Sequence, residues 1–232
     1  MLKSNLAKRK QSLIAFLLFT FLSFVLFFNK FPLAGENLRS IGNDFNSFFL
    51  NWHYMAKKLA VGKIPHWTPY ESLGGQPFIG NGFANLYPIH FIGYLLIFLL
   101  GIGEGAIFIF LAEIVFHFAI GGFFAYLFFR DGLKINFWPA LVGAAVFIFN
   151  PIFITFTEAP AQLFSSIWLP AVLYFLTRFF DTRSWSKLYL AGLFFGLSLL
   201  GGYFYNSLLI FIFSFAWAAF LVSKKQGSVK ER

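Results

Sequence analysis

The sequence predicts an all-α protein: a polytopic helical bundle in a membrane, with six spans, one re-entrant or interfacial helix and an external loop. Three observations predict this class. Of the 232 residues, 59% are hydrophobic and only 12% are charged, whereas soluble domains carry about 25% charged residues. Apolar segments recur along the chain, most of them near the roughly 20 residues that a helix needs to cross a bilayer. Basic residues gather at the ends of these segments, which is typical of cytoplasmic loops.

Seven apolar segments are visible, and each is expected to be a helix because backbone in lipid must satisfy its own hydrogen bonds. The segments are Ser12–Phe28, Tyr87–Leu100, Ala106–Phe129, Pro139–Phe156, Leu163–Phe180, Leu188–Tyr203 and Tyr205–Val222. The first has the basic start of a signal peptide. Its length and the lack of an Ala-x-Ala cleavage site favour a retained anchor.

The basic residues decide how many segments cross the membrane. They lie at the start of the chain, at 130–134, at 178–187 and in the tail, whereas Glu104 and Glu158 occupy turns without basic residues. If all seven segments crossed, the basic loop at 130–134 and the basic tail would lie outside. The conflict disappears if the short segment Tyr87–Leu100 does not cross. We therefore expect six spans and two cytoplasmic termini.

Residues 1–232 are expected to form one membrane domain. Within it, residues 29–86 form an external first loop and residues 223–232 a basic cytoplasmic tail. The net charge of +9 fits orientation in the bilayer and contact with anionic membrane lipids, so nucleic-acid binding is not expected. The chain has no cysteine, which excludes a disulfide, a thiolate metal site and a Cys nucleophile.

An amphipathic helix is expected early in the external loop. Asn43 or Asp44 can cap it, and apolar residues recur at helical spacing from Phe45 to Leu59. The pattern is typical of a helix on the membrane surface, with aromatic residues among the head groups and lysines in water. The following segment, GKIPHWTPYESLGGQPF, is rich in Gly and Pro and predicts ordered turns.

Several short motifs follow one another in this region: Gly-Asn-Asp before the loop helix, then GKIPHW, GGQPFIGN and NLYPIH. In their order and spacing the chain resembles the class C membrane glycosyltransferases (GT-C), and within them the YfhO-type membrane protein family. The resemblance covers the first loop and the helix after it, and the later spans more loosely. It implies transfer of a sugar from a polyprenyl-phosphate-linked donor to an acceptor, on the outer side of a prokaryotic plasma membrane.

The resemblance also implies a larger assembly. Relatives of the YfhO type are several times longer than these 232 residues. The chain is therefore expected to be either a minimal version that holds only the N-terminal membrane module, or one piece of a split or truncated gene that a partner subunit or a further C-terminal region would complete. The alternative function is that of a non-enzymatic polytopic membrane protein: a transporter subunit, a lipid-binding scaffold or an inactive remnant of the family.

The essential acidic residue of the family's first external loop corresponds by this resemblance to Asp44. Transfer to a hydroxyl needs a base, or a divalent metal held by a carboxylate, beside the attacking oxygen. A helix N-terminus favours a negative charge there, and a simple helix cap is the alternative role of Asp44. Glu158 lies in an external turn and is the candidate for a second catalytic carboxylate, although a surface turn explains it as well.

Phosphate and sugar groups on a donor predict further contacts in the first loop. Fixed cations stabilise the charge on a departing phosphate, aromatic rings pack on sugars, and amides beside flexible glycines hydrogen-bond to them. The candidate substrate-binding residues are Arg39, Lys57, Lys58, His53, His66, Trp67, Gln76 and Asn81. Contact with anionic lipid, anchoring at the interface and turn geometry are the alternative roles of these residue types.

Glu113 and His117 lie four residues apart in a predicted span, on one face of its helix. Ionisable residues are costly at membrane depth and indicate function by default. The two residues are expected either to pair with each other inside the bundle or to line a cavity through which a lipid-linked donor enters.

Overall fold

The structure is a computed structural model that describes residues 2–27, 43–65, 67, 84–101, 103 and 105–230, and every regular element in these ranges is a helix. The elements are α1 (Leu2–Phe27), α2 (Asn43–Ala60), α3 (Pro88–Leu100), α4 (Ala106–Leu127), the π-helix η3 (Phe128–Gly132), α5 (Phe137–Ile148), α6 (Pro151–Thr155), α7 (Pro160–Ser166), α8 (Leu169–Thr182), α9 (Trp185–Leu200) and α10 (Phe204–Lys230). The predicted all-α class is confirmed.

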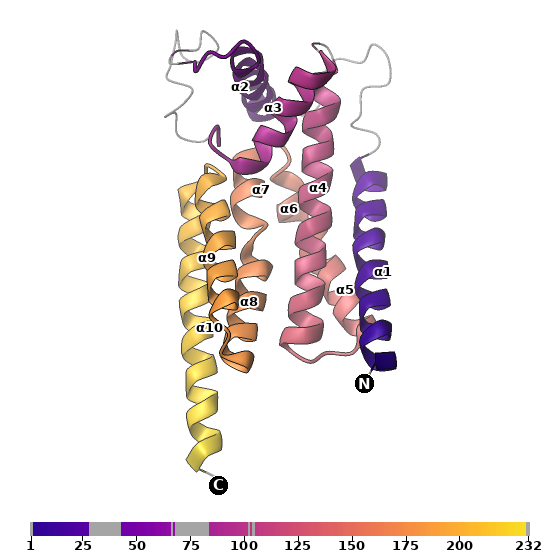
Figure 1. Ribbon diagram of the computed structural model, residues 1–232, viewed down its shortest axis with the longest axis vertical. Coiled ribbons are helices and arrows are strands. Elements are labelled where there is room, and N and C mark those ends of the chain that lie inside the picture. The colour runs from indigo at the N-terminus through magenta and orange to yellow at the C-terminus, as the bar shows by residue number, and fades with distance from the viewer. Residues whose placement is uncertain are drawn as a thin grey trace.

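The long helices stand side by side as an upright bundle in which α4 contacts α1, α5 and α8 (Figure 1). Helices α2 and α3 cover one end of this bundle, which we call the α2 end. The opposite end holds the start of α1, the η3 segment, the α8–α9 turn and both chain termini (Figure 1). Since basic residues occur in all three segments, we call it the basic end.

Four stretches of the described chain are long and apolar enough to cross a membrane: Lys8–Phe27, Ala106–Gly132, Pro160–Thr182 and Phe204–Lys224. This confirms apolar helices of membrane-spanning length. Helices α3, α5 and α9 are apolar but shorter. At 1.5 Å per residue, the 13 residues of α3 measure about 20 Å, which is less than the bilayer core of about 30 Å.

Two predicted continuous segments are interrupted in the structure. Pro139–Phe156 divides into α5 and α6, because the Asn150 side chain accepts a hydrogen bond from the Phe153 backbone N–H (3.0 Å) and Pro151 begins the new helix. Leu163–Phe180 divides into α7 and α8 just before Pro170, which cannot donate a backbone hydrogen bond. The last helix, in contrast, runs beyond Val222 through most of the predicted tail.

Two glycines allow close packing along α4. A Cβ on Gly122 would lie 2.6 Å from the Phe19 ring of α1, and a Cβ on Gly121 would lie 2.5 Å from the Ile167 side chain. Small residues of this kind let membrane helices approach closely, where van der Waals packing stabilises them.

The predicted amphipathic helix is confirmed as α2, but its surroundings differ from the prediction. Its apolar face is buried against protein, with the ring centroids of Phe45 and Phe110 5.5 Å apart and those of Trp52 and Tyr94 also 5.5 Å apart. The aromatic stripe thus packs on α3 and α4 in place of lipid head groups. Asn51, a polar residue of the same helix, is fully buried as well.

A tight turn ends α2. Gly62 adopts a φ of +70°, the Lys63 N–H bonds to the Lys58 carbonyl (2.9 Å), and the Gly62 N–H bonds to the Leu59 carbonyl (2.9 Å). This is the Schellman motif, in which a left-handed glycine satisfies the last carbonyls of a helix.

Candidate functional site

A cluster of hydrogen-bonding side chains is buried where α3, α4 and the start of α8 meet. We call it the polar cluster; its members are Tyr87, His90, Glu113, His117 and Trp168. Tyr87 precedes the first residue of α3, and Pro88 at that first position fixes the direction in which the helix leaves. All five residues are buried, and Glu113 is 7% exposed.

One half of the polar cluster is a continuous hydrogen-bond chain. Trp168 Nε1–H donates to the Tyr87 hydroxyl oxygen at 2.9 Å, and the Tyr87 hydroxyl lies 2.7 Å from His117 Nε2. His117 Nδ1 lies 2.6 Å from the Glu113 backbone carbonyl. Because an indole N–H only donates and a carbonyl only accepts, we assign the proton of His117 to Nδ1. The Tyr87 hydroxyl then donates to His117 Nε2.

The other half is a pair formed by His90 and Glu113. His90 Nδ1 lies 2.5 Å from Glu113 Oε1. The second atoms of the pair, His90 Nε2 and Glu113 Oε2, are buried without a hydrogen-bond partner among the residues that the structure describes. Glu113 therefore bonds with its carboxylate to His90 on α3 and with its backbone carbonyl to His117, so the contact between Glu113 and His117 runs through the Glu113 backbone.

Aromatic rings enclose the polar cluster. The Phe164 ring lies 4.5 Å from the His117 ring and 5.1 Å from the His90 ring, measured between centroids, and the Phe48 ring of α2 lies 5.9 Å from His90. In such apolar surroundings a charge is costly unless a partner compensates it. The surroundings therefore explain why the Glu113 carboxylate and the His90 ring are held together.

A groove of about 470 Å³ runs between α3 and α4, and Glu113 is the one ionisable residue in its lining. The other lining residues are Ile89, Ile92, Gly93, Leu96, Phe108, Ile109, Ala112 and Phe116. Glu113 thus contributes both to the polar cluster and to an apolar groove on the side of the bundle.

The two predicted catalytic carboxylates are both exposed. Asp44 lies in the first turn of α2, and Glu158 lies in the turn between α6 and α7. In the described ranges, no hydrogen bond or ion pair joins these two residues, and no three His, Cys, Asp or Glu side chains gather as a metal-binding set.

Lys57 and Lys58, the predicted phosphate-binding residues, lie in the last turn of α2. Lys57 lies thirteen positions after Asp44 in this one helix, which corresponds to about 20 Å along its axis. The Lys58 ammonium lies over the Tyr54 ring, 5.4 Å from its centroid. The structure therefore does not bring these lysines together with Asp44.

The remaining first-loop candidates divide into described and undescribed residues. His53 is half-buried and stacks on Phe49 with centroids 5.7 Å apart; burial, and to a lesser extent the nearby Lys57, lowers its pKa. Trp67 is exposed, and its backbone carbonyl accepts a hydrogen bond from the Tyr54 hydroxyl (2.9 Å). Arg39, His66, Gln76 and Asn81 lie outside the described residues.

Three members of the polar cluster escaped the sequence analysis. His90 carries the signal that selected Glu113, since it is an ionisable residue inside an apolar segment. Tyr87 and Trp168 carry no such signal in a chain that is 23% aromatic. Comparison with known proteins adds nothing to the assignment, because no protein-family model, no curated protein and no solved structure matches the chain.

Proposed function

We propose that this chain acts as a membrane glycosyltransferase-like protein that transfers a sugar from a polyprenyl-phosphate-linked donor to an acceptor hydroxyl at the α2 end of the bundle. The resemblance of the first-loop motifs to the GT-C class supports this function. One structural observation carries it further: Asp44 is exposed in the first turn of α2 while the apolar face of the same helix is buried against α3 and α4. A docked helix holds a carboxylate in a fixed position at the surface, as a catalytic base requires.

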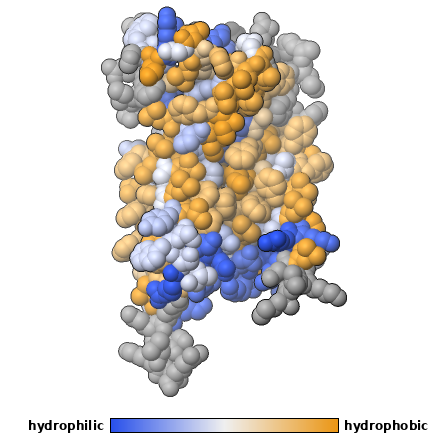
Figure 2. Space-filling model, in the orientation of Figure 1, coloured by the Kyte–Doolittle hydropathy of each residue, from blue (hydrophilic) through white to orange (hydrophobic). Residues whose placement is uncertain are grey.

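The proposed topology has six spans: α1, α4 with η3, α5 with α6, α7 with α8, α9 and α10. Helix α3 is the re-entrant element, which its length of 13 residues supports. Hydrophilic side chains gather at the lower end of the bundle in Figure 2, where Figure 1 marks both termini and where the basic segments lie. This grouping supports placing that end in the cytoplasm of a prokaryote. The α2 end, with Asp44, then faces the exterior.

In the proposed step Asp44 removes the proton from the acceptor hydroxyl. The oxygen of that hydroxyl forms a bond to the anomeric carbon of the sugar. The bond between the anomeric carbon and the phosphate oxygen breaks, and the lipid phosphate leaves with the electron pair. Because Lys57 lies about 20 Å from Asp44 along α2, we assign Lys57 and Lys58 to solvent and lipid head groups. Arg39, the nearest basic residue before Asp44 in the sequence, is the better candidate for the departing phosphate.

A transfer assay with the purified chain and a radiolabelled polyprenyl-phosphate sugar tests the proposal. We expect Asp44→Asn to insert into the membrane normally and to lose about 10²- to 10⁴-fold in transfer rate, the usual contribution of a general base. The matched control is Asp181→Asn, which alters a partly exposed carboxylate at the basic end and should leave the rate unchanged. Full transfer by Asp44→Asn would remove Asp44 from the mechanism, and absence of transfer by the wild type would favour a non-enzymatic role.

A further inference from the structure

We propose that the basic end of the bundle binds one anionic phospholipid, whose phosphate contacts Lys134 and Lys224 and whose acyl chain lies between α8 and α10. The site is distinct from the one proposed around Asp44, because it lies at the opposite end of the bundle. The inference requires that the bundle crosses a membrane, and it does not depend on glycosyl transfer.

The cavity at the basic end has an excess of positive charge. It measures about 740 Å³, and the charged residues in its lining are Lys134, Asp181 and Lys224. Asp181 is already shared by two cations, because its Oδ2 lies 3.4 Å from Lys134 Nζ and 3.8 Å from Arg178 Nη1. Lys224 is exposed and forms no ion pair among the residues that the structure describes. A phosphate group is therefore the counter-charge that fits this cavity.

Lys134 enters the cavity from an unusual backbone turn at the end of the π-helix η3. The Leu133 N–H donates to the Phe128 carbonyl at 2.9 Å, five residues back. The Ile135 N–H donates to the Phe129 carbonyl at 3.1 Å. Between these bonds Lys134 has a φ of +62°, a left-handed conformation that residues other than glycine rarely adopt. Irregular helix ends and conformations of this kind are frequent at functional sites.

An apolar slot of about 300 Å³ adjoins the cavity between α8 and α10. Trp217 lines both spaces, and its Nε1–H donates to Thr177 Oγ1 at 2.8 Å, which joins α10 to α8 at the junction. A free phosphate ion would use the charged cavity alone, whereas a phospholipid fills the cavity and the slot together. The slot is lined by Leu169, Leu173, Phe213, Ala216 and Trp217.

The length of the combined site matches one leaflet of a bilayer. Helices α8 and α10 run side by side toward the basic end (Figure 1). Lys224 in the cavity lies eleven positions after Phe213 in the slot, which corresponds to about 17 Å along α10. One leaflet contributes about 15 Å of the hydrocarbon core. A lipid whose phosphate lies at Lys224 therefore has its acyl chain beside the slot.

The charge of the cavity selects the head group. Phosphatidylglycerol carries one negative charge, which the two lysines compensate. Phosphatidylcholine carries the same phosphate and also a trimethylammonium group, which would add a cation beside Lys134 and Lys224. Basic pockets between membrane helices bind anionic head groups in the same way. The cavity therefore favours a phospholipid with a net negative charge.

Native mass spectrometry of the full-length chain tests the proposal by measuring the affinity for dioleoylphosphatidylglycerol and for dioleoylphosphatidylcholine in detergent. We expect one phosphatidylglycerol to bind about tenfold more tightly than phosphatidylcholine. Lys224→Gln should lose about fivefold in affinity for phosphatidylglycerol, which is the upper range for one exposed charge pair. The matched control is Lys10→Gln, which removes the same charge from an exposed position of α1 outside the cavity and should bind as the wild type does.

A slot-filling variant tests the acyl chain separately. Ala216 is exposed and lines the slot, so Ala216→Phe should weaken phosphatidylglycerol binding about tenfold. Its control, Ala219→Phe, alters an exposed position of the same helix outside both spaces and should have no effect. An excess of inorganic phosphate should not displace the lipid.

Four results would each overturn the proposal. They are equal affinity for the two phospholipids, equal losses in Lys224→Gln and Lys10→Gln, wild-type affinity in Ala216→Phe, and displacement of the lipid by inorganic phosphate. The second result would assign the preference to the overall charge of the basic end, and the fourth would assign the cavity to a free anion.

Discussion

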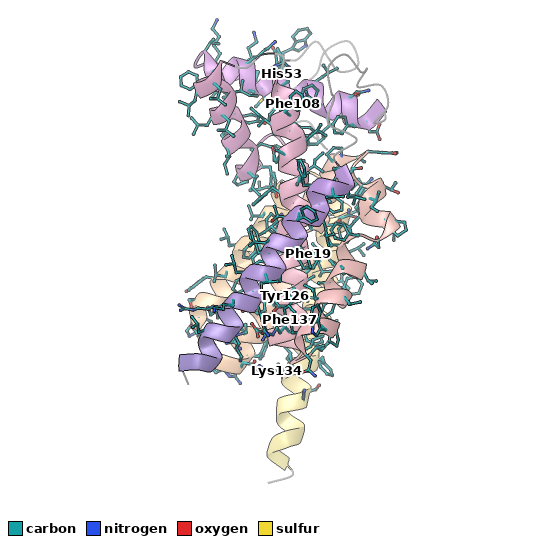
Figure 3. The ribbon with its side chains drawn as sticks, turned by 90° about the vertical axis from the view of Figure 1, so that its right-hand side faces the viewer. Phe19, His53, Phe108, Tyr126, Lys134 and Phe137 are labelled. Carbon is teal, nitrogen blue, oxygen red and sulfur yellow. The ribbon has the colours of Figure 1, made fainter. Side chains whose placement is uncertain are left out.

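At the α2 end of the bundle, Glu113 and His90 meet 2.5 Å apart and out of reach of water, with side chains 6% and 0% exposed. At the basic end, Lys134 and Asp181 meet at 3.4 Å, with side chains 66% and 38% exposed. Figure 3 shows how far apart these regions are, with Phe108 near one end and Lys134 near the other. Removing one partner of a buried pair leaves an uncompensated buried charge, which is strongly destabilising. An exposed pair contributes only about 0–1 kcal/mol to stability.

The groove near one pair and the cavity near the other differ in the polarity of the side chains that line them. The groove beside Glu113 is lined almost entirely by apolar side chains. The cavity at the basic end, of about 740 Å³, includes Lys134, Asp181 and Lys224 in its lining. The two ends therefore differ in the polarity of these cavities as well as in the burial of their ion pairs.

The largest effect is expected from breaking the buried pair. His90→Leu leaves the Glu113 carboxylate without its partner and should lower the free energy of unfolding by about 3–5 kcal/mol. Lys134→Ala should lower it by at most about 1 kcal/mol. Unfolding by denaturant in detergent measures both. Combining His90→Leu with Glu113→Leu should recover most of the loss, and equal effects of the two single variants would contradict the contrast between the ends.

A smaller effect is expected from the hydrogen-bond chain beside that pair. Tyr87→Phe leaves Trp168 Nε1 and His117 Nε2 without the hydroxyl that joins them, which should cost about 1–3 kcal/mol of stability. Tyr189→Phe is the matched control, because Tyr189 is 75% exposed on α9, and it should change nothing measurable. If Tyr87→Phe leaves the free energy of unfolding unchanged, the hydrogen-bond chain does not stabilise the fold.

The smallest effect concerns the half-buried His53. Burial lowers the pKa of His53 below its usual 6.5 in the folded chain, and the neighbouring Lys57 lowers it further. The unfolded chain then takes up a proton more readily than the folded one, so the contribution of His53 to stability is complete above pH 6.5 and is lost as pH falls below it. The melting temperature should fall less between pH 7.5 and pH 5 in His53→Gln than in the wild type. An identical fall in both would assign the pH dependence to other groups.

Local patterns were sufficient to predict the elements, although not their surroundings. The apolar stripe of α2 was predicted correctly because its periodic pattern lies within one short segment of the sequence. Its burial depends on Phe110 and Tyr94, which belong to other helices later in the chain. The break at Asn150–Pro151 was not predicted, although it has a local sequence signal, a capping residue followed by Pro.

The candidate site shows the same division. Glu113 and His117 were selected because charge is rare in apolar segments, and His90 was accessible to the same argument. The pairing of His90 with Glu113, 23 positions away, depends on how α3 packs on α4, which no short pattern encodes. The distance from Asp44 to Lys57, in contrast, follows from the length of α2 alone.

Accessibility of single cysteines is the most direct test of the central claim, that the α2 end with Asp44 faces the exterior and the basic end the cytoplasm. The natural chain has no cysteine, so one substitution at a time gives an unambiguous label. In intact cells, a membrane-impermeant maleimide should label Asp44→Cys and should label Lys134→Cys only after lysis. Labelling of Lys134→Cys alone in intact cells, or of both variants equally, would contradict the claim.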